Sequence, residues 1–371
     1  MSALKKVAKQ KVKKKVTNAV TGGSGGGGKN KKKKGGKGGI IAAIICAITL
    51  LIGGGGAAAF FGGFLGGGEE DVTVPAITEN VQLPEAETGT EDPAPPAQVP
   101  TPPATAVSGE VHVHFIDVGQ GDAILIHSDT HAMLIDGGDN RVVTRNAILD
   151  YIDSVGVTRL DYIVATHPHL DHIGSFVYIK NSGRVDVGRV MMPDQTHTSQ
   201  AFNRLLDTIE SHDTPVTIAE RGLTFSLGDM NFTVIAPTPG AAPFPTAQLN
   251  DASVVLHLAH GENTFIFTGD AEVGSERDMV ASAYTFRADI MQAGHHGSRT
   301  SSSEDFINAV APSVVAISVG AGNSYGHPHG EVMDRFYDRD LSIFRTDTMG
   351  TITFTSNGVD VTLPDGSSMR N

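Results

Sequence analysis

The chain has 371 residues with 41 acidic and 28 basic side chains, and these charges are distributed unevenly along it. All 41 acidic residues follow position 68, so residues 110–371 carry 33 acidic and 15 basic side chains, a net charge of −18. That charge excludes attraction of polyanions by a general positive field. The single cysteine, Cys46, excludes an intrachain disulfide and leaves residues 110–371 without a thiolate metal ligand or a cysteine nucleophile.

The first 67 residues predict attachment to a membrane. Residues 1–39 contain 13 lysines and no acidic residue, which is typical of a disordered basic tail. Residues 40–67 carry no charge and are long enough for a transmembrane helix of about 20 residues. Because lysines crowd only the N-terminal side, we expect a cytoplasmic N-terminus and a single-pass protein of the cell membrane with its globular part outside. A cleaved signal peptide would instead give a secreted protein.

Residues 68–109 predict a linker. They contain many prolines and no Lys or Arg, and eight of them are acidic. Such a segment is extended and semi-rigid, so we expect it to hold the following domain away from the membrane.

Residues 110–371 predict one large domain in which strands and helices are interleaved. Strand patterns cover residues 111–118, 123–128, 131–138, 160–167, 232–237, 253–260, 263–270, 288–297, 313–320, 351–356 and 359–364. Helical spacing covers residues 144–154, 201–209, 274–282, 303–310 and 331–339. This mixture indicates the α/β class, with two sheets covered by helices rather than an all-β sandwich.

The strongest chemical signal is the segment Thr166-His-Pro-His-Leu-Asp-His-Ile-Gly-Ser175, directly after an apolar strand. Four side chains that can bind metals fall within six residues, and a loop leaving a strand can point them at two ions. We expect His167 and His169 to hold one ion, and Asp171 and His172 to hold the other. Imidazole and carboxylate ligands suit two divalent ions, with Zn the expected metal and Mn the alternative.

This HxHxDH motif resembles the hallmark of the metallo-β-lactamase superfamily. Further motifs follow in the order seen in the soluble hydrolase domain of ComEC-type competence proteins, and the resemblance covers residues 111–360. They are FIDVGQGDAILI (115–126), MLIDGG (133–138), NDASVVL (250–256), FTGD (267–270), AGHHGSRTSSS (293–303) and GNSYGHP (322–328). The resemblance implies an αββα sandwich with the metals at one edge, between the two sheets.

The resemblance also implies roles for single residues. Asp270 is expected to bridge the two ions, and one of His295 and His296 to be the last ligand of the second. His296 is favoured as that ligand, with its neighbour contacting substrate. Asp136 is expected to orient the histidine loop from behind, and His327 to face the substrate or donate a proton.

A ligand usual in the family is missing, which leaves the occupancy of the first site open. Many members supply a third histidine, but neither His197 nor His212 stands in a matching context, and Asn250-Asp251 occupies the corresponding place. We expect Asn250 and Asp251 to support the ligands.

The DVGQGD stretch contains Asp117 and, further on, Gln120-Gly121-Asp122. We expect this stretch to form a turn beneath the site, with Asp117 supporting the ligands. The remaining histidines of the strand patterns are expected to have no metal role, namely His112, His114, His257 and His260.

The expected reaction is hydrolysis by a metal-bound hydroxide. Asp171 or Asp270 would orient the hydroxide, and His327 would protonate the leaving group. The resemblance implies phosphodiester substrates, either DNA outside the cell or smaller ones such as teichoic-acid phosphocholine or nucleotides.

The acidic domain fits the smaller substrates better, since DNA would need a local cluster of arginines. Arg184, Arg189 and Arg299 are the candidates for such a cluster. The alternatives are a β-lactam or thioester hydrolase, and a non-catalytic surface-binding module with the same fold. The sequence does not identify a protein partner.

Overall fold

The computed structural model describes residues 107–370; the predicted tail, anchor and nearly all of the linker lie outside that range. No helix within residues 107–370 is long and apolar enough to cross a bilayer. Near the start of the described range, the Ser108 backbone N–H and hydroxyl both donate to Asp229 Oδ2 at 2.7 Å.

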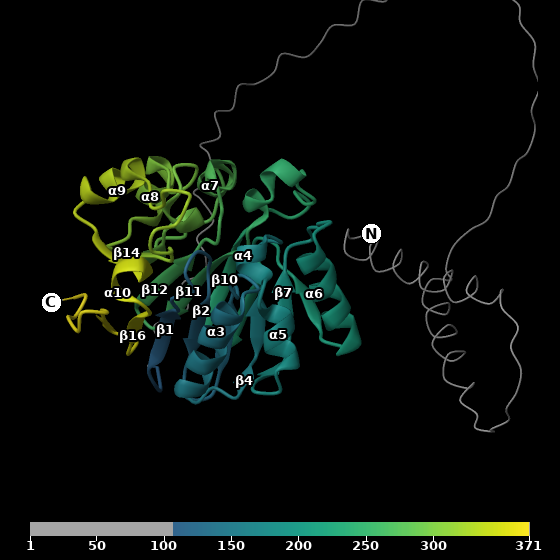
Figure 1. The fold of residues 1–371 in the computed structure, drawn as a ribbon. Coiled ribbons are helices and arrows are strands. Elements are labelled where there is room, and N and C mark those ends of the chain that lie inside the picture. The colour runs from purple at the N-terminus through teal and green to yellow at the C-terminus, as the bar shows by residue number, and fades with distance from the viewer. Residues whose placement is uncertain (1–106, 371) are drawn as a thin grey trace, which may run out of the picture. The chain divides into compact units, whose positions relative to one another are not determined.

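Two mixed sheets form the centre of the described domain (Figure 1). In spatial order, the eight-stranded sheet consists of β17 (Val361–Thr362), β16 (Ile352–Ser356), β1 (Val111–Phe115), β2 (Ile124–His127), β3 (Ala132–Ile135), β5 (Tyr162–Val164), β7 (Val190–Met192) and β8 (Val216–Ile218). The seven-stranded sheet consists of β15 (Ser342–Arg345), β14 (Val314–Ile317), β13 (Ile290–Gln292), β12 (Asn263–Phe267), β11 (Val255–His260), β10 (Met230–Ala236) and β9 (Thr224–Leu227). A small separate ladder pairs β4 (Arg159–Leu160) with β6 (Asp186–Val187).

Helices cover the outer face of each sheet. The first sheet packs against α3 (Val142–Ser154), α5 (Phe176–Asn181) and α6 (Gln200–Ser211), and the second against α7 (Val273–Val280), α8 (Glu304–Val310) and α9 (Gly330–Tyr337). The two short helices are α4 (Leu170–Ile173) and α10 (Thr346–Met349). The four layers confirm the predicted α/β fold of two helix-covered sheets (Figure 1).

The core between the sheets follows from strand alternation. Phe115 of β1 points inward, and its ring lies 6.3 Å from that of Phe267 in the other sheet and 6.0 Å from that of Phe354. All three are at most 1% exposed. Burying an aromatic side chain of this size stabilises the fold by about 1.5–3 kcal/mol, so these positions bind the two sheets together.

The candidate ligands lie where parallel strands end. In the first sheet β3, β5 and β7 run parallel, and the HxHxDH segment follows β5. In the second sheet β12, β13 and β14 run parallel, with Asp270 after β12 and His295-His296 after β13. Because the carboxyl ends of parallel strands share one edge, loops far apart in sequence meet there.

Three histidines form a stack on the helix-covered side of β1 and β2. The rings of His112 and His114 each lie 5.0 Å from that of His127. His114 Nε2 is 3.0 Å from His127 Nε2, and its Nδ1 is 2.8 Å from the Thr353 hydroxyl. Burial, reinforced by His127 and then His112, lowers the pKa of His114 to about 3.

This lowered pKa predicts that acid weakens the fold through His114. Unfolded histidine takes up a proton near pH 6.5, whereas folded His114 stays neutral down to about pH 3. Its contribution to stability is therefore fully present above pH 6.5 and is lost progressively below it. Between pH 7 and pH 5 we expect the free energy of unfolding of wild type to fall by about 2 kcal/mol more than that of His114→Asn. Chemical denaturation at both pH values measures this, and equal losses would contradict it.

Candidate metal centre

The HxHxDH segment leaves β5 and turns into α4, with His169 directly before that helix. Asp136 fixes this turn from below: its carboxylate accepts the Thr166 backbone N–H at 2.9 Å and the Thr166 hydroxyl at 2.6 Å. Asp136 is fully buried and adopts a left-handed backbone, with φ of 58°. A non-glycine residue held there is strained, so the surrounding contacts must enforce this geometry.

The same carboxylate orients His172. Asp136 Oδ2 accepts from His172 Nδ1 at 2.7 Å, which turns Nε2 into the site. Burial raises the pKa of Asp136 to about 6, although His172 acts in the opposite direction. In metal-binding histidines, a hydrogen bond to the ring nitrogen that does not bind the metal sets the orientation of the ring.

Asp171, His172 and His296 form one group of potential metal ligands, with ligand atoms within 4.8 Å of one another. His296 Nδ1 donates to the Ser318 carbonyl at 3.0 Å, so its Nε2, like that of His172, faces the group. Nε2 of His296 is 3.7 Å from Asp171 Oδ2. This is the set predicted for the second ion, with His296 rather than His295 among the donors.

His167, His169 and Asp270 form a second such group. Asp270 Oδ2 lies 3.7 Å from His167 Nε2 and 3.2 Å from His172 Nε2. Asp270 Oδ1 is 3.6 Å from His296 Nε2. The Asp270 carboxylate therefore lies between the two groups, where a bridging ligand would be.

The donor atoms fit divalent cations. His172 Nε2, His296 Nε2 and Asp270 Oδ1 are buried and have no hydrogen-bond partner among the described residues. Leaving such atoms unpaired costs about 1–3 kcal/mol each, so their convergence needs a partner that they can all bind. Imidazole nitrogens and carboxylate oxygens together suit Zn or Mn.

The carboxylates of the centre raise the pKa of two histidines, His172 and His296. Burial lowers the pKa of His172, but the carboxylates of Asp270 and Asp136 outweigh it and hold that pKa well above its ordinary value. Burial likewise opposes protonation of His296, whose pKa Asp270 and Asp122 raise. Cations that bind Nε2 of both rings therefore displace protons.

His295 belongs to neither group. Its Nε2 lies 3.5 Å from Asp270 Oδ2, and its Nδ1 lies 3.2 Å from Glu272 Oε1. Asn250 Nδ2 donates to Glu272 at 3.0 Å and lies 3.4 Å from His295 Nδ1. Asp251 accepts the backbone N–H groups of Glu272 and Ser275 at the start of α7. Asn250 and Asp251 thus hold Glu272, which in turn holds His295 beside Asp270.

His327 approaches the same site from the loop after β14. Its ring lies 5.5 Å from that of His295 and 6.3 Å from that of His296. Asn323 fixes the loop by accepting the His327 N–H at 3.0 Å, and His327 Nδ1 is buried without a partner among residues 107–370. Burial, with His295 next, lowers the pKa of His327 to about 4.

Sequence reasoning placed Asp117 under the ligands, but Asp122 occupies that place. Asp117 is exposed and accepts only the backbone N–H of Gly119, at 3.0 Å, among the hydrogen bonds of the described residues. Asp122 is 1% exposed and lies 3.6 Å from His296 Nδ1 and 3.8 Å from His172 Nδ1. Both aspartates stand in the DVGQGD stretch, so this motif could have identified Asp122 from the sequence. No sequence motif marked Glu272 as part of the site.

The two histidines considered as a third ligand lie in different places. His197 follows β7, and its ring is 6.2 Å from that of His169 in an edge-on arrangement. His212 ends α6, where its Nε2 lies 2.7 Å from Asn181 Oδ1. The structure therefore brings His197 to the site and leaves His212 away from it.

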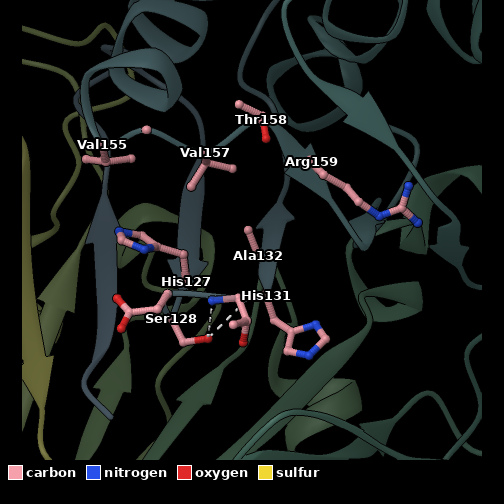
Figure 2. A pocket seen from close by; sticks show the side chains of 11 residues that line it. His127, Ser128, His131, Ala132, Val155, Val157, Thr158 and Arg159 are labelled. Carbon is pink, nitrogen blue, oxygen red and sulfur yellow. Dashed lines mark hydrogen bonds between the residues drawn. The ribbon is translucent and has the colours of Figure 1, made fainter.

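A separate pocket of about 250 Å³ lies between the turn after β2 and the loop after α3 (Figure 2). His127, Ser128, Val157 and Arg159 are among the residues that line it, and none of the candidate metal ligands does. We assign it no role in the metal centre.

The sequence of this chain matches a known family model and several known proteins. The family model described as Metallo-beta-lactamase superfamily matches residues 116–320. ComE operon protein 3 of Bacillus subtilis (strain 168) is 27% identical over 264 residues, which are 67% of this chain and 33% of that protein. Competence protein ComA of Neisseria gonorrhoeae is 27% identical over 255 residues, 68% of this chain and 33% of that protein. The chain spans about a third of the length of these curated relatives.

Among solved structures, the chain aligns with the metallo-beta-lactamase fold protein YhfI from Bacillus subtilis. It aligns with a TM-score of 0.45 and 13% sequence identity over 67% of this chain and 100% of that chain.

Asp136→Asn should lower metal affinity about 10–100-fold, because the amide cannot accept from both Thr166 and His172 as the carboxylate does. Asp117→Asn is the matched control, since that carboxylate is exposed and touches none of the candidate ligands. Competition with a chromogenic chelator measures both affinities. Equal affinity in the two variants would show that Asp136 does not support the ligands.

Metal binding should release protons, and the apparent affinity should fall as the pH drops. The reason is that the pKa values of His172 and His296 are raised in the metal-free protein. Calorimetric titration with Zn in buffers of different ionisation enthalpy should show release of about two protons per chain. His296→Gln should release fewer, and a proton count independent of that change would argue against the assignment.

Proposed function

Because this chain belongs to the metallo-beta-lactamase superfamily, we propose that it is a metal-dependent hydrolase of phosphodiesters with two divalent ions. The observation that carries the proposal is the position of Asp270 between two groups of donor atoms. The ions would be held by His167, His169 and Asp270 on one side and by Asp171, His172, His296 and Asp270 on the other. Zn is the expected metal and Mn the alternative.

When bound, such ions supply a water of lowered pKa and polarise the phosphoryl oxygen under attack. The chain's own residues then set the geometry. Asp171 and Asp270 would accept a hydrogen bond from the attacking water and so orient it. His295 has its Nδ1 against Glu272 and its Nε2 3.5 Å from Asp270 Oδ2, and we propose that this Nε2 contacts a substrate oxygen.

His327 is proposed to protonate the leaving oxygen. Its lowered pKa keeps the ring neutral at pH 7 in the free protein. A phosphodiester anion beside the ring would raise that pKa toward neutrality, which is the range a general acid needs. The ring contacts with His295 and His296 place it at the same face of the site.

The choice of a phosphodiester rests on the relatives. The match to ComE operon protein 3 and to competence protein ComA confirms the resemblance to ComEC-type competence proteins. That resemblance favours phosphodiesters over a β-lactam or a thioester. DNA and smaller cell-surface phosphodiesters both remain within the proposal.

The location proposed for this activity is the outer face of the cell membrane. Support comes from residues 1–67 alone, with 13 lysines followed by an uncharged segment. The predicted linker, residues 68–109, would then separate the hydrolase domain from the bilayer.

Metal content and hydrolysis by the purified full-length chain test the function. Bis-p-nitrophenyl phosphate, linear DNA and a chromogenic β-lactam would be offered with added Zn or Mn. We expect metal-dependent cleavage of the phosphodiesters that falls at least about 100-fold in the Asp171→Ala, His172→Ala double variant, which removes two donors of one group. His212→Ala, at the end of α6, is the control and should keep full activity.

Two results would overturn the proposal. Turnover of the β-lactam alone would replace the substrate class. If the chain holds no metal and cleaves none of the substrates, the non-catalytic binding module becomes the remaining hypothesis.

A further inference from the structure

Tyr325 stands two residues before His327, in the loop after β14, and its ring packs on the His327 ring. The two ring centres are 5.7 Å apart, and the ring planes are inclined by only 24°. Tyr325 is 63% exposed, so most of its surface is open to solvent. Among the Phe and Tyr side chains of residues 107–370, the only other exposed one is Tyr337, at 60%. Single exposed apolar side chains are common on protein surfaces, so the surroundings of Tyr325 must indicate its role.

The loop that carries Tyr325 is fixed by Asn323. The Asn323 Oδ1 accepts the backbone N–H groups of Tyr325 and His327 at 3.1 and 3.0 Å. Its Nδ2 donates to the carbonyls of Gly320 and His327 at 3.0 and 2.6 Å. Gly320 packs directly on the DVGQGD stretch, because a Cβ there would lie 2.6 Å from the Gln120 backbone nitrogen. An exposed ring on a loop held in this way loses little conformational freedom when it binds a ligand.

The contact with His327 relates Tyr325 to one part of the substrate. His327 is the residue proposed to protonate the leaving oxygen, and its ring lies 5.5 Å from that of His295. A group attached to the leaving oxygen would therefore come within reach of the Tyr325 ring, which packs on His327. Aromatic rings attract one another in offset or edge-on arrangements with centres about 4.5–7 Å apart. A planar ring on the leaving oxygen can form such a contact with Tyr325.

The arginines considered from the sequence are engaged within the domain. Arg184 pairs with two aspartates at 2.7 and 2.5 Å, and Arg299 pairs with Glu331 at 3.5 Å. Arg189 donates to the Thr217 hydroxyl. In a domain with a net charge of −18, an uncharged aromatic contact adds affinity for substrate without depending on a positive field.

We propose that Tyr325 determines specificity on the leaving side of the site by stacking on a planar aromatic ring carried by the leaving oxygen. The proposal rests on the phosphodiesterase function proposed above and adds the chemical class of the leaving group. A saturated group of the same size would fill the same space without the attraction between rings. That attraction changes an affinity by about two- to tenfold.

The test uses two probes that differ only in the ring, phenyl methylphosphonate and cyclohexyl methylphosphonate. Each has a single ester oxygen, so its ring takes the place of the leaving group. Calorimetry with added Zn measures the affinity of the full-length chain for both probes, in wild type, Tyr325→Ala, Tyr325→Phe and Tyr337→Ala. Tyr337→Ala is the matched control, because it removes a similarly exposed tyrosine at the end of α9. The KM for bis-p-nitrophenyl phosphate is measured alongside.

We expect wild type to bind the phenyl probe about two- to tenfold more tightly than the cyclohexyl probe. Tyr325→Ala should remove this difference, whereas Tyr325→Phe, which keeps the ring, and Tyr337→Ala should retain it. The KM for bis-p-nitrophenyl phosphate should rise in Tyr325→Ala by about the same factor. A purely structural role of Tyr325 would weaken the binding of both probes equally, and that result would overturn the proposal.

The remaining outcomes separate this proposal from the hydrolase. Equal affinity of wild type for the two probes, or binding of neither, would overturn the assignment of an aromatic leaving group even if phosphodiesters are cleaved. A chain that cleaves no phosphodiester but prefers the phenyl probe through Tyr325 would sustain the ring-binding role while overturning the hydrolase.

Discussion

Asp136 accepts hydrogen bonds from the Thr166 backbone, the Thr166 hydroxyl and His172 in a fully buried position, and the metal centre depends on this carboxylate. It ties the end of β3 to the end of β5, which fixes where the HxHxDH segment begins. It also selects the ring nitrogen of His172 that faces the site. The left-handed backbone of Asp136 costs about 1–3 kcal/mol, and a position under such strain persists only when its neighbours enforce it.

Left-handed backbone conformations also orient side chains at the end of a strand in the second sheet. His295 and His296 both have positive φ, 51° and 57°, so the chain turns sharply after β13 and sends the two rings in different directions. His296 points toward Asp171 and Asp270, held by the Ser318 carbonyl, whereas His295 points past Asp270 and is held by Glu272. The positive φ values of these two residues therefore direct His296 into the group of potential ligands and His295 to Glu272.

The buried carboxylates at this edge of the sandwich favour the binding of a cation. Asp122, Asp136 and Asp270 are each at most 2% exposed and lie around His172 and His296. These carboxylates raise the pKa of both histidines well above its ordinary value, so a cation that binds the two rings would compete with protons. Residues 110–371 carry a net charge of −18, so the domain as a whole does not attract polyanions.

The sequence by itself determined the fold class and most of the candidate site. Alternating and apolar runs marked the longer strands, and the spacing of HxHxDH after a strand marked four candidate ligands, because both patterns are local. Tertiary structure alone decided the short edge strands and the residues that support the ligands from other parts of the chain. Edge strands β8 and β9 span only three and four residues, so their alternation is too short to predict a strand from the sequence. Asp122 and Glu272 belong to the site only through His296 and His295, which folding brings to the edge where parallel strands from both sheets end.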